Sequence, residues 1–232
     1  MGRACRLLLL VVLPTLGFAQ EFHVGLKAGV PLTSSFDTKR APLVSSPIRR
    51  YTLGASAELR FGAHFGIEVD VLYKRIGYSA TSFCGLRCQP QVISQNPEII
   101  TMHISDAVDA KANSWEFPIL AKYRLPGTIH PYFAGGFAAR RVKLASGRCL
   151  STDERIGSGV PGGFTVTTEI PCSSRLPDRS FAGIAVSTGL EMGREHFRVL
   201  PEFRYTRWFQ NDSWGIARFA SNQAEFLLGF LF

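Results

Sequence analysis

Hydrophobic and polar residues alternate with a period of two along much of the chain, which is typical of β-strands with one apolar face. The last nine residues show the pattern clearly. One side carries Ala224, Phe226, Leu228, Phe230 and Phe232, and the other carries Glu225, Leu227, Gly229 and Leu231. The alternation predicts eight strands, at residues 22–30, 51–61, 64–74, 115–125, 130–142, 181–192, 197–208 and 224–232. Pro201 predicts a bulge or local distortion in the seventh, because proline cannot donate to a strand ladder.

The connections between these segments are short and long in strict alternation. The short ones lie around residues 62–63, 126–127 and 193–194, and the long ones span 31–50, 75–114, 143–180 and 209–222. An up-and-down barrel with both chain ends on one side has this layout, and in outer-membrane barrels the short turns are periplasmic and the long loops external. The pattern therefore predicts an all-β, eight-stranded, antiparallel up-and-down barrel.

The two faces of the strands differ in a way that favours a membrane. The apolar face carries aromatic residues near its ends, in the pairs Tyr51 and Phe61, Phe65 and Tyr73, and Trp115 and Tyr123. Such pairs match the two interfacial girdles of a transmembrane barrel. A soluble barrel of the calycin type is the alternative; it would bury the apolar face and expose the charged one.

The N-terminus predicts export, which supports the membrane interpretation. Arg3 and Arg6 precede an apolar run from Leu7 to Leu13, and residues 17–19 form a small-x-small cleavage site. We therefore divide the chain into a signal peptide at residues 1–19 and an outer-membrane barrel domain at residues 20–232.

In a transmembrane barrel the polar face points inward. Its charged residues are Lys27, Glu58, Arg60, Glu68, Asp70, Lys74, Glu116, Lys122, Arg124, Arg140, Glu202, Arg204 and Glu225. Eight strands enclose only enough space for their own side chains, and buried charges must pair. Five leucines share this inward parity: Leu72, Leu120, Leu200, Leu227 and Leu231. We expect a plugged, charge-paired interior and a structural or surface-interaction function; a narrow gated channel is the alternative.

Four cysteines remain once Cys5 leaves with the signal: Cys84, Cys88, Cys149 and Cys172. An even number in an exported chain favours disulfides. Of the three connectivities we prefer Cys84–Cys88 with Cys149–Cys172, which would stiffen the external loops. A four-thiolate metal site is disfavoured by the spacing and by the oxidising compartment. The segment at 165–170, between the last two cysteines, alternates enough to form a hairpin above the barrel.

Composition excludes other classes of protein. Loss of Arg3 and Arg6 leaves 24 basic and 18 acidic residues, scattered without a basic block, so no nucleic-acid partner is expected. Beyond the signal no apolar stretch is long enough for a spanning helix. We predict no cofactor, no metal site and no catalytic residues.

Two histidine patterns are candidate sites. His103 and Ser105 have the spacing of the His–Ser pair of lipid A deacylases, but lie in an expected loop without a clear orienting carboxylate. A lipid-modifying enzyme is therefore the least favoured function. His23, His64, His130 and His196 each open a strand at the periplasmic end, where a pH-sensitive or metal-binding rim competes with simple turn closure.

The segments at 115–123 (WEFPILAKY) and 131–136 (PYFAGG) resemble the central hairpin of the bacterial outer-membrane β-barrel domain family, the small porin-like barrels of OmpA and OmpX type. Residues 22–29 resemble its first strand. The resemblance implies an eight-stranded outer-membrane barrel, usually without enzymatic activity. It also implies an assembly signal at Phe226, Leu228, Phe230 and Phe232, which the barrel-assembly machinery recognises. The other expected partners are outer-membrane lipid and an extracellular ligand or protein at the loops.

Overall fold

The computed structural model describes residues 20–37, 44–45, 51–83, 92–96, 99–157, 164–170, 178–194, 197–209, 213–214 and 217–232. The expected signal peptide at residues 1–19 lies outside this part of the chain. Within the described residues there is no helix with the length and apolar character needed to cross a membrane.

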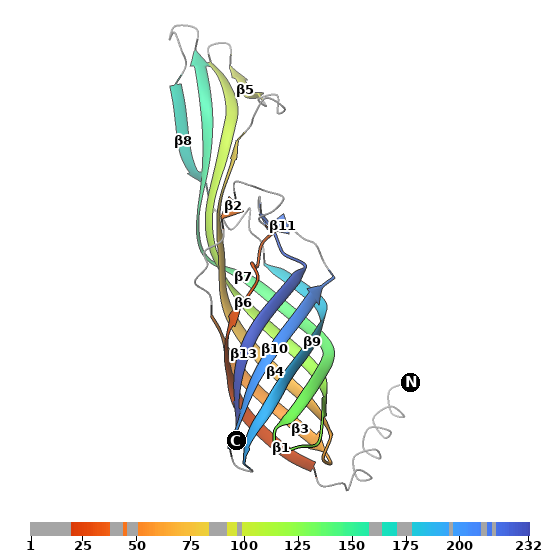
Figure 1. Cartoon of the computed structure of the whole chain (residues 1–232). Coiled ribbons are helices and arrows are strands. Elements are labelled where there is room, and N and C mark those ends of the chain that lie inside the picture. The colour runs from red at the N-terminus through yellow and green to blue at the C-terminus, as the bar shows by residue number, and fades with distance from the viewer. Residues whose placement is uncertain are drawn as a thin grey trace, which may run out of the picture.

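Eight antiparallel strands form a closed barrel (Figure 1). They are β1 (Gln20–Pro31), β3 (Thr52–Phe61), β4 (Phe65–Phe83), β6 (Ile99–Arg124), β7 (His130–Gly157), β9 (Arg179–Arg194), β10 (Phe197–Trp208) and β13 (Asn222–Leu231). Each pairs with the next along the chain, and β1 pairs with β13 to close the ring. The predicted eight-stranded, antiparallel up-and-down barrel is confirmed.

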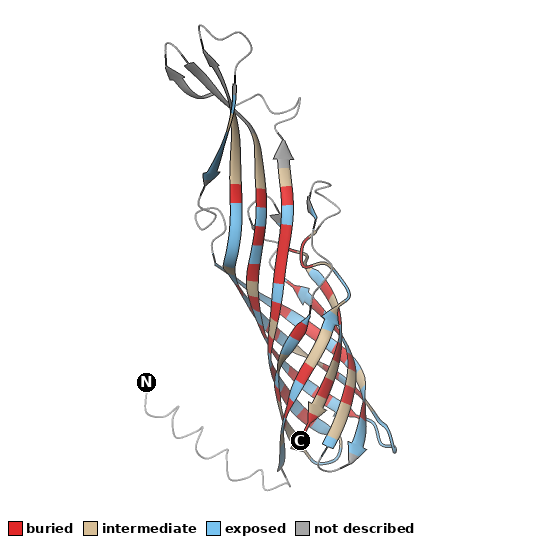
Figure 2. Ribbon diagram, turned by 90° about the vertical axis from the view of Figure 1, so that its left-hand side faces the viewer, coloured by how far each residue is buried: buried red, intermediate tan, exposed pale blue. Residues whose placement is uncertain are grey.

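The strand faces point as the alternation predicts. Buried and exposed residues alternate along the barrel wall (Figure 2). On β4 the apolar residues face outward, with Phe65 60% and Val71 39% exposed, whereas Glu68 and Asp70 are buried inside. A soluble barrel would show the reverse orientation, so the calycin-type alternative is wrong.

Aromatic side chains meet across strands at both ends of the outward apolar band. Near the short turns the rings of Phe65 and Tyr123 lie 5.0 Å apart, and near the opposite end those of Tyr73 and Trp115 lie 5.1 Å apart. These pairs sit at the two levels expected for interfacial girdles.

The short turns join the strands at the end where the chain begins and ends. Gly62, between β3 and β4, has a φ of 66°, and Gly193, at the end of β9, has a φ of 137°. Both values favour glycine, because side chains on other residues clash there.

Three strands are longer than predicted. Residues 75–83, 99–114 and 143–157 were expected in loops, but they continue β4, β6 and β7 beyond the barrel (Figure 1). The expectation was wrong because small residues such as Ala110 and Ala112 make a weak apolar pattern. They nevertheless face inward and are fully buried against Tyr78 and Val142. We call this projecting sheet the extension.

Five short strands complete the fold. They are β2 (Val44–Ser45), β5 (Val92–Asn96), β8 (Phe164–Ile170), β11 (Ser213–Trp214) and β12 (Ala217–Arg218). β2 pairs with β4, β5 with β6, β8 with β7, and β11 with β12. The β7–β8 pairing confirms the hairpin predicted at 165–170.

Pro201 interrupts one ladder without changing its register. Pairing of β10 with β9 passes from Val199–Met192 to Glu202–Gly189 and leaves out Leu200 and Pro201. Pairing with β13 continues through Pro201, opposite Leu228. The predicted distortion is therefore local to the β9 side.

Candidate functional site

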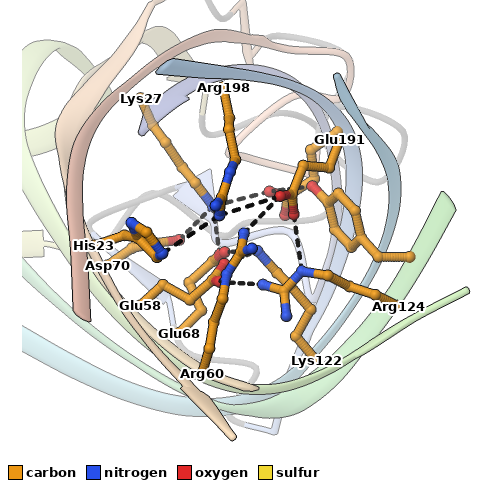
Figure 3. Close-up of polar contacts among 12 residues, drawn as sticks. His23, Lys27, Glu58, Arg60, Glu68, Asp70, Lys122, Arg124, Glu191 and Arg198 are labelled. Atoms are coloured by element: carbon orange, nitrogen blue, oxygen red, sulfur yellow. Dashed lines mark hydrogen bonds and ion pairs between the residues drawn. The ribbon is translucent and has the colours of Figure 1, made fainter. Parts of the chain in front are cut away.

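A network of charged side chains fills the middle of the barrel, and Lys27 of β1 lies at its centre (Figure 3). Its Nζ is 3.1 Å from Asp70 Oδ2 and 2.9 Å from Glu202 Oε2, and it also contacts Glu68. Arg204 reaches the same carboxylates, with Nη2 2.7 Å from Asp70 Oδ2. Inward positions on β1, β4 and β10 are thereby joined across the lumen.

A second group lies nearer the short turns, at the periplasmic end. Arg60 donates from Nη2 to Glu191 Oε1 at 2.6 Å, and Arg124 donates from Nε to Glu191 Oε2 at 2.8 Å. Both arginines also contact Glu58, and Lys122 donates to Glu58 Oε2 at 2.8 Å. This group connects β3, β6 and β9, and Lys122 links it to Glu68 in the central network.

A third group lies towards the extension. Lys74 donates to Glu116 Oε2 at 2.6 Å and also contacts Glu225. Arg140 lies beside them, with Nη1 3.2 Å from Gln223 Oε1 and 3.9 Å from Glu116 Oε1. These residues come from β4, β6, β7 and β13.

An aromatic cluster covers Arg140 at the external end. The guanidinium carbon of Arg140 is 4.4 Å from the ring centroid of Trp208, 5.0 Å from that of Phe181 and 5.5 Å from that of Phe219. The ring of Phe36 stacks on Phe219 at 4.9 Å. Phe36 and Phe219 lie outside the barrel strands and join through a single β-bridge, so two connections meet over the lumen.

Apolar side chains fill the space between the charged groups. The five leucines predicted to point inward, Leu72, Leu120, Leu200, Leu227 and Leu231, are all buried. Leu120 lies against Gly136, and Tyr132 lies over Gly189, where an added Cβ would come within 2.6 Å of the phenol. Gly189 thus makes room for the ring of Tyr132, and Gly136 lets the backbones of β6 and β7 approach closely.

The thirteen charged residues singled out from the sequence all lie on the inner side of the wall, twelve of them buried and Arg60 part-buried. Sequence reasoning missed Glu191 and Arg198, which contact each other at 3.4 Å, and the polar partners Tyr132 and Gln223. The parity of β9 and β10 could have located the first two, because Leu190 and Phe197 beside them point outward.

The sequence candidates outside this network are only partly described. Cys149 is buried and disulfide-bonded, but Cys84, Cys88 and Cys172 lie outside the described residues, so the connectivity stays a prediction. His103 and Ser105 lie on β6 rather than in a loop, and the register with β7 shifts between them.

The histidines at the periplasmic end have separate neighbours. Nδ1 of His64 is 3.1 Å from the carbonyl oxygen of Arg124, and Nδ1 of His130 is 3.2 Å from that of Leu125. Nε2 of His23 is 3.3 Å from Oε2 of Glu21, and His196 is outside the described residues. Across the described ranges no three potential ligands gather into a metal site.

Comparisons with known proteins place the chain in context. Residues 18–211 match the model of the family described as "Outer membrane protein beta-barrel domain". Among curated proteins no match was found.

Similar solved structures include Neisserial surface protein A, with 13% identity, a TM-score of 0.43, and coverage of 92% of this chain and 97% of that one. The attachment invasion locus protein Ail of Yersinia pestis gives 9% identity, a TM-score of 0.38 and coverage of 92% and 97%. The N-terminal barrel domain of Pseudomonas aeruginosa OprF gives 10% identity, a TM-score of 0.38 and coverage of 93% and 98%.

Proposed function

The chain belongs to the outer membrane protein β-barrel domain family and lies in the outer membrane, and from this premise we propose that it is a structural or surface-interaction protein. The observation that carries the proposal is the dense packing of side chains across the lumen, between the periplasmic mouth and the external end. Charged groups occupy the middle and both sides of it, leucines fill the gaps, and aromatic rings cover the external end. We infer that such a barrel serves as a rigid base for the extension.

The extension is the part that we propose for contact with a partner. β6 and β7 run from the barrel wall into it and stay paired from Arg124–Tyr132 to Ile99–Gly157, with register shifts only at residues 103–105 and 111–112. The pairing makes the projecting sheet a continuation of the wall, and stiff external segments suit recognition because little conformational entropy is lost on binding.

The outward face of the wall supports contact with outer-membrane lipid. It is apolar up to the level of Tyr73 and Trp115, and basic residues follow on β4, β6 and β7. The exposed basic side chains are Arg75, Lys111, Arg141, Lys143 and Arg148. This order suits acyl chains below and anionic groups above, whether on lipid or on an extracellular ligand.

Export and assembly complete the proposal. We propose residues 1–19 as a cleaved signal peptide. We also propose the outward side chains Phe226, Leu228 and Phe230 of β13, together with Phe232 just beyond it, as the signal read by the barrel-assembly machinery. Phe226 and Phe232 are exposed, and the rings of Phe197 and Phe232 lie 5.7 Å apart at the periplasmic end. We propose no enzymatic activity, as the family resemblance implies.

We expect the purified barrel to show no ion conductance in planar bilayers. The charged network spans the lumen through contacts such as Lys27–Glu202 and Lys122–Glu58, and the aromatic cluster covers its external end. Single-channel recording with a known open porin as the positive control measures this. Reproducible conductance steps would instead support the narrow gated channel.

We propose that Cys149 pairs with Cys172 and that Cys84 pairs with Cys88. Cys149 starts the β7–β8 pairing opposite Ile170, two residues before Cys172. We expect reduction to speed proteolysis within residues 150–171 while the urea midpoint of the barrel stays unchanged, because the bond lies in the extension. Peptide mapping before and after reduction measures both pairing and cleavage. A map showing Cys149 joined to Cys84 or Cys88 would contradict the pairing.

A further inference from the structure

We propose that the periplasmic mouth of the barrel is a binding site for a compact oxyanion, a carboxylate or phosphate group carried by a periplasmic solute. The site is a cavity of about 270 Å³ at the end with the short turns. Its lining consists of Arg60, Ala63, Arg124, His130, Glu191, Gly193 and Arg198. This inference goes beyond the proposed function, which uses only the external end and the filled lumen.

Three guanidinium groups converge on one carboxylate in this cavity (Figure 3). Arg60 and Arg124 each donate to a different oxygen of Glu191, and Arg198 lies 3.4 Å from Oε1 of the same carboxylate. The lining therefore has three positive groups against one negative group. Glu58 lies behind it, where Arg60, Arg124 and Lys122 share its two oxygens.

The hydrogen-bond donors of the three arginines also favour an anionic ligand. Each guanidinium has five N–H donors, whereas a carboxylate offers about four acceptor positions. The three guanidinium groups together have more N–H donors than the carboxylates of Glu191 and Glu58 can accept, so an acceptor that enters the cavity can use the surplus.

Among the described residues, Glu21 is a further acidic group near the mouth, and it does not cancel this excess. Glu21 is largely exposed, with 60% of its side chain accessible, and its carboxylate contacts His23. His23 in turn lies 3.4 Å from Nη1 of Arg198. Because Glu21 is solvated at the rim and does not line the cavity, its field on the cavity is screened.

The geometry selects the class of ligand. Arginine forks match the spacing of oxygen atoms in carboxylate and phosphate, and they bind these groups with two parallel hydrogen bonds. The cavity has room for a free phosphate, for a short dicarboxylate, or for the terminal group of a larger solute. Monatomic anions cannot make the paired contacts.

The test uses the refolded full-length barrel in detergent and measures binding of phosphate and of succinate by isothermal titration calorimetry. Chloride at equal ionic strength and succinamide serve as controls for charge and for shape. Arg198→Gln is the test variant, because Arg198 is only part-buried and makes long contacts, so the barrel wall is retained. We expect binding to weaken at least tenfold. Arg207→Gln, exposed near the external end of the same strand, is the matched control and should bind as the parent does.

Each outcome decides the proposal. Binding of phosphate alone or of succinate alone supports the site and identifies the source of the oxyanion. Binding of neither, equal binding of succinamide, or unchanged affinity in Arg198→Gln would overturn it. An unchanged heat-modifiable gel shift in the variant verifies that lost binding does not reflect lost folding.

Discussion

Replacing Lys27 by methionine is expected to lower the free energy of unfolding of the barrel by about 3–5 kcal/mol, the cost of removing one partner from a buried ion pair. Lys27 is buried and contacts Glu68, Asp70 and Glu202 at once. Methionine keeps most of the volume of lysine but removes its charge. The buried carboxylates of Glu68, Asp70 and Glu202 then lose one of the positive groups that balance them. Urea titration in lipid vesicles, followed by tryptophan fluorescence and gel mobility, measures the change.

Two further variants show whether the loss comes from charge. Lys111→Met removes an exposed lysine from the outward face of the extension, and we expect a change within about 0.5 kcal/mol. Adding Asp70→Asn to Lys27→Met should restore part of the lost stability, because one uncompensated carboxylate becomes neutral. A urea midpoint for Lys27→Met equal to that of the parent would show that the central pairs do not stabilise the barrel.

Replacing Gly136 by valine is expected to destabilise the barrel by about 3 kcal/mol, the upper end of the cost of overpacking. A Cβ at this inward position on β7 would lie 2.0 Å from the carbonyl oxygen of Ile119 and 3.1 Å from Cα of Leu120. Both contacts are with the backbone of β6, so the strand pair must move apart. The same urea titration measures the effect.

The neighbouring glycine provides the matched control. A Cβ on Gly135 would meet nothing closer than 3.8 Å, so Gly135→Val should leave stability unchanged or raise it slightly through better strand propensity. Equal urea midpoints for the two variants would mean that the interior is loose enough to accept a larger side chain opposite Leu120.

The wall of the barrel could be predicted because both the apolar and the charged residues of its strands indicate which side chains face inward. A period of two fixes which residues share a face, and one-residue slips are excluded because they would turn Lys27 or Glu68 towards lipid. The inward direction of both residues followed from the sequence alone. Glu191 was missed because the residues before it on the same face of β9, Ala185, Ser187 and Gly189, are small and do not mark that face as polar.

The external part could not be predicted in the same way. Phe36 and Phe219 lie in connections, where no period relates one residue to the next, and only the closed ring brings them together. Residues 99–114 form a strand although small and polar residues interrupt the apolar alternation from Ser105 onwards. Their pairing with β4 and β7 stabilises the strand, and that pairing depends on the whole sheet rather than on the local sequence.

The seam between β1 and β13 joins strands from opposite ends of the barrel sequence, so the cylinder cannot close until both strands are in the membrane. Until then Lys27 is separated from Glu202, and Lys74 from Glu225, by the missing strands. An unfinished sheet would present these ionic groups to hydrocarbon without their partners. We therefore expect insertion of the wall and neutralisation of its interior to be coupled.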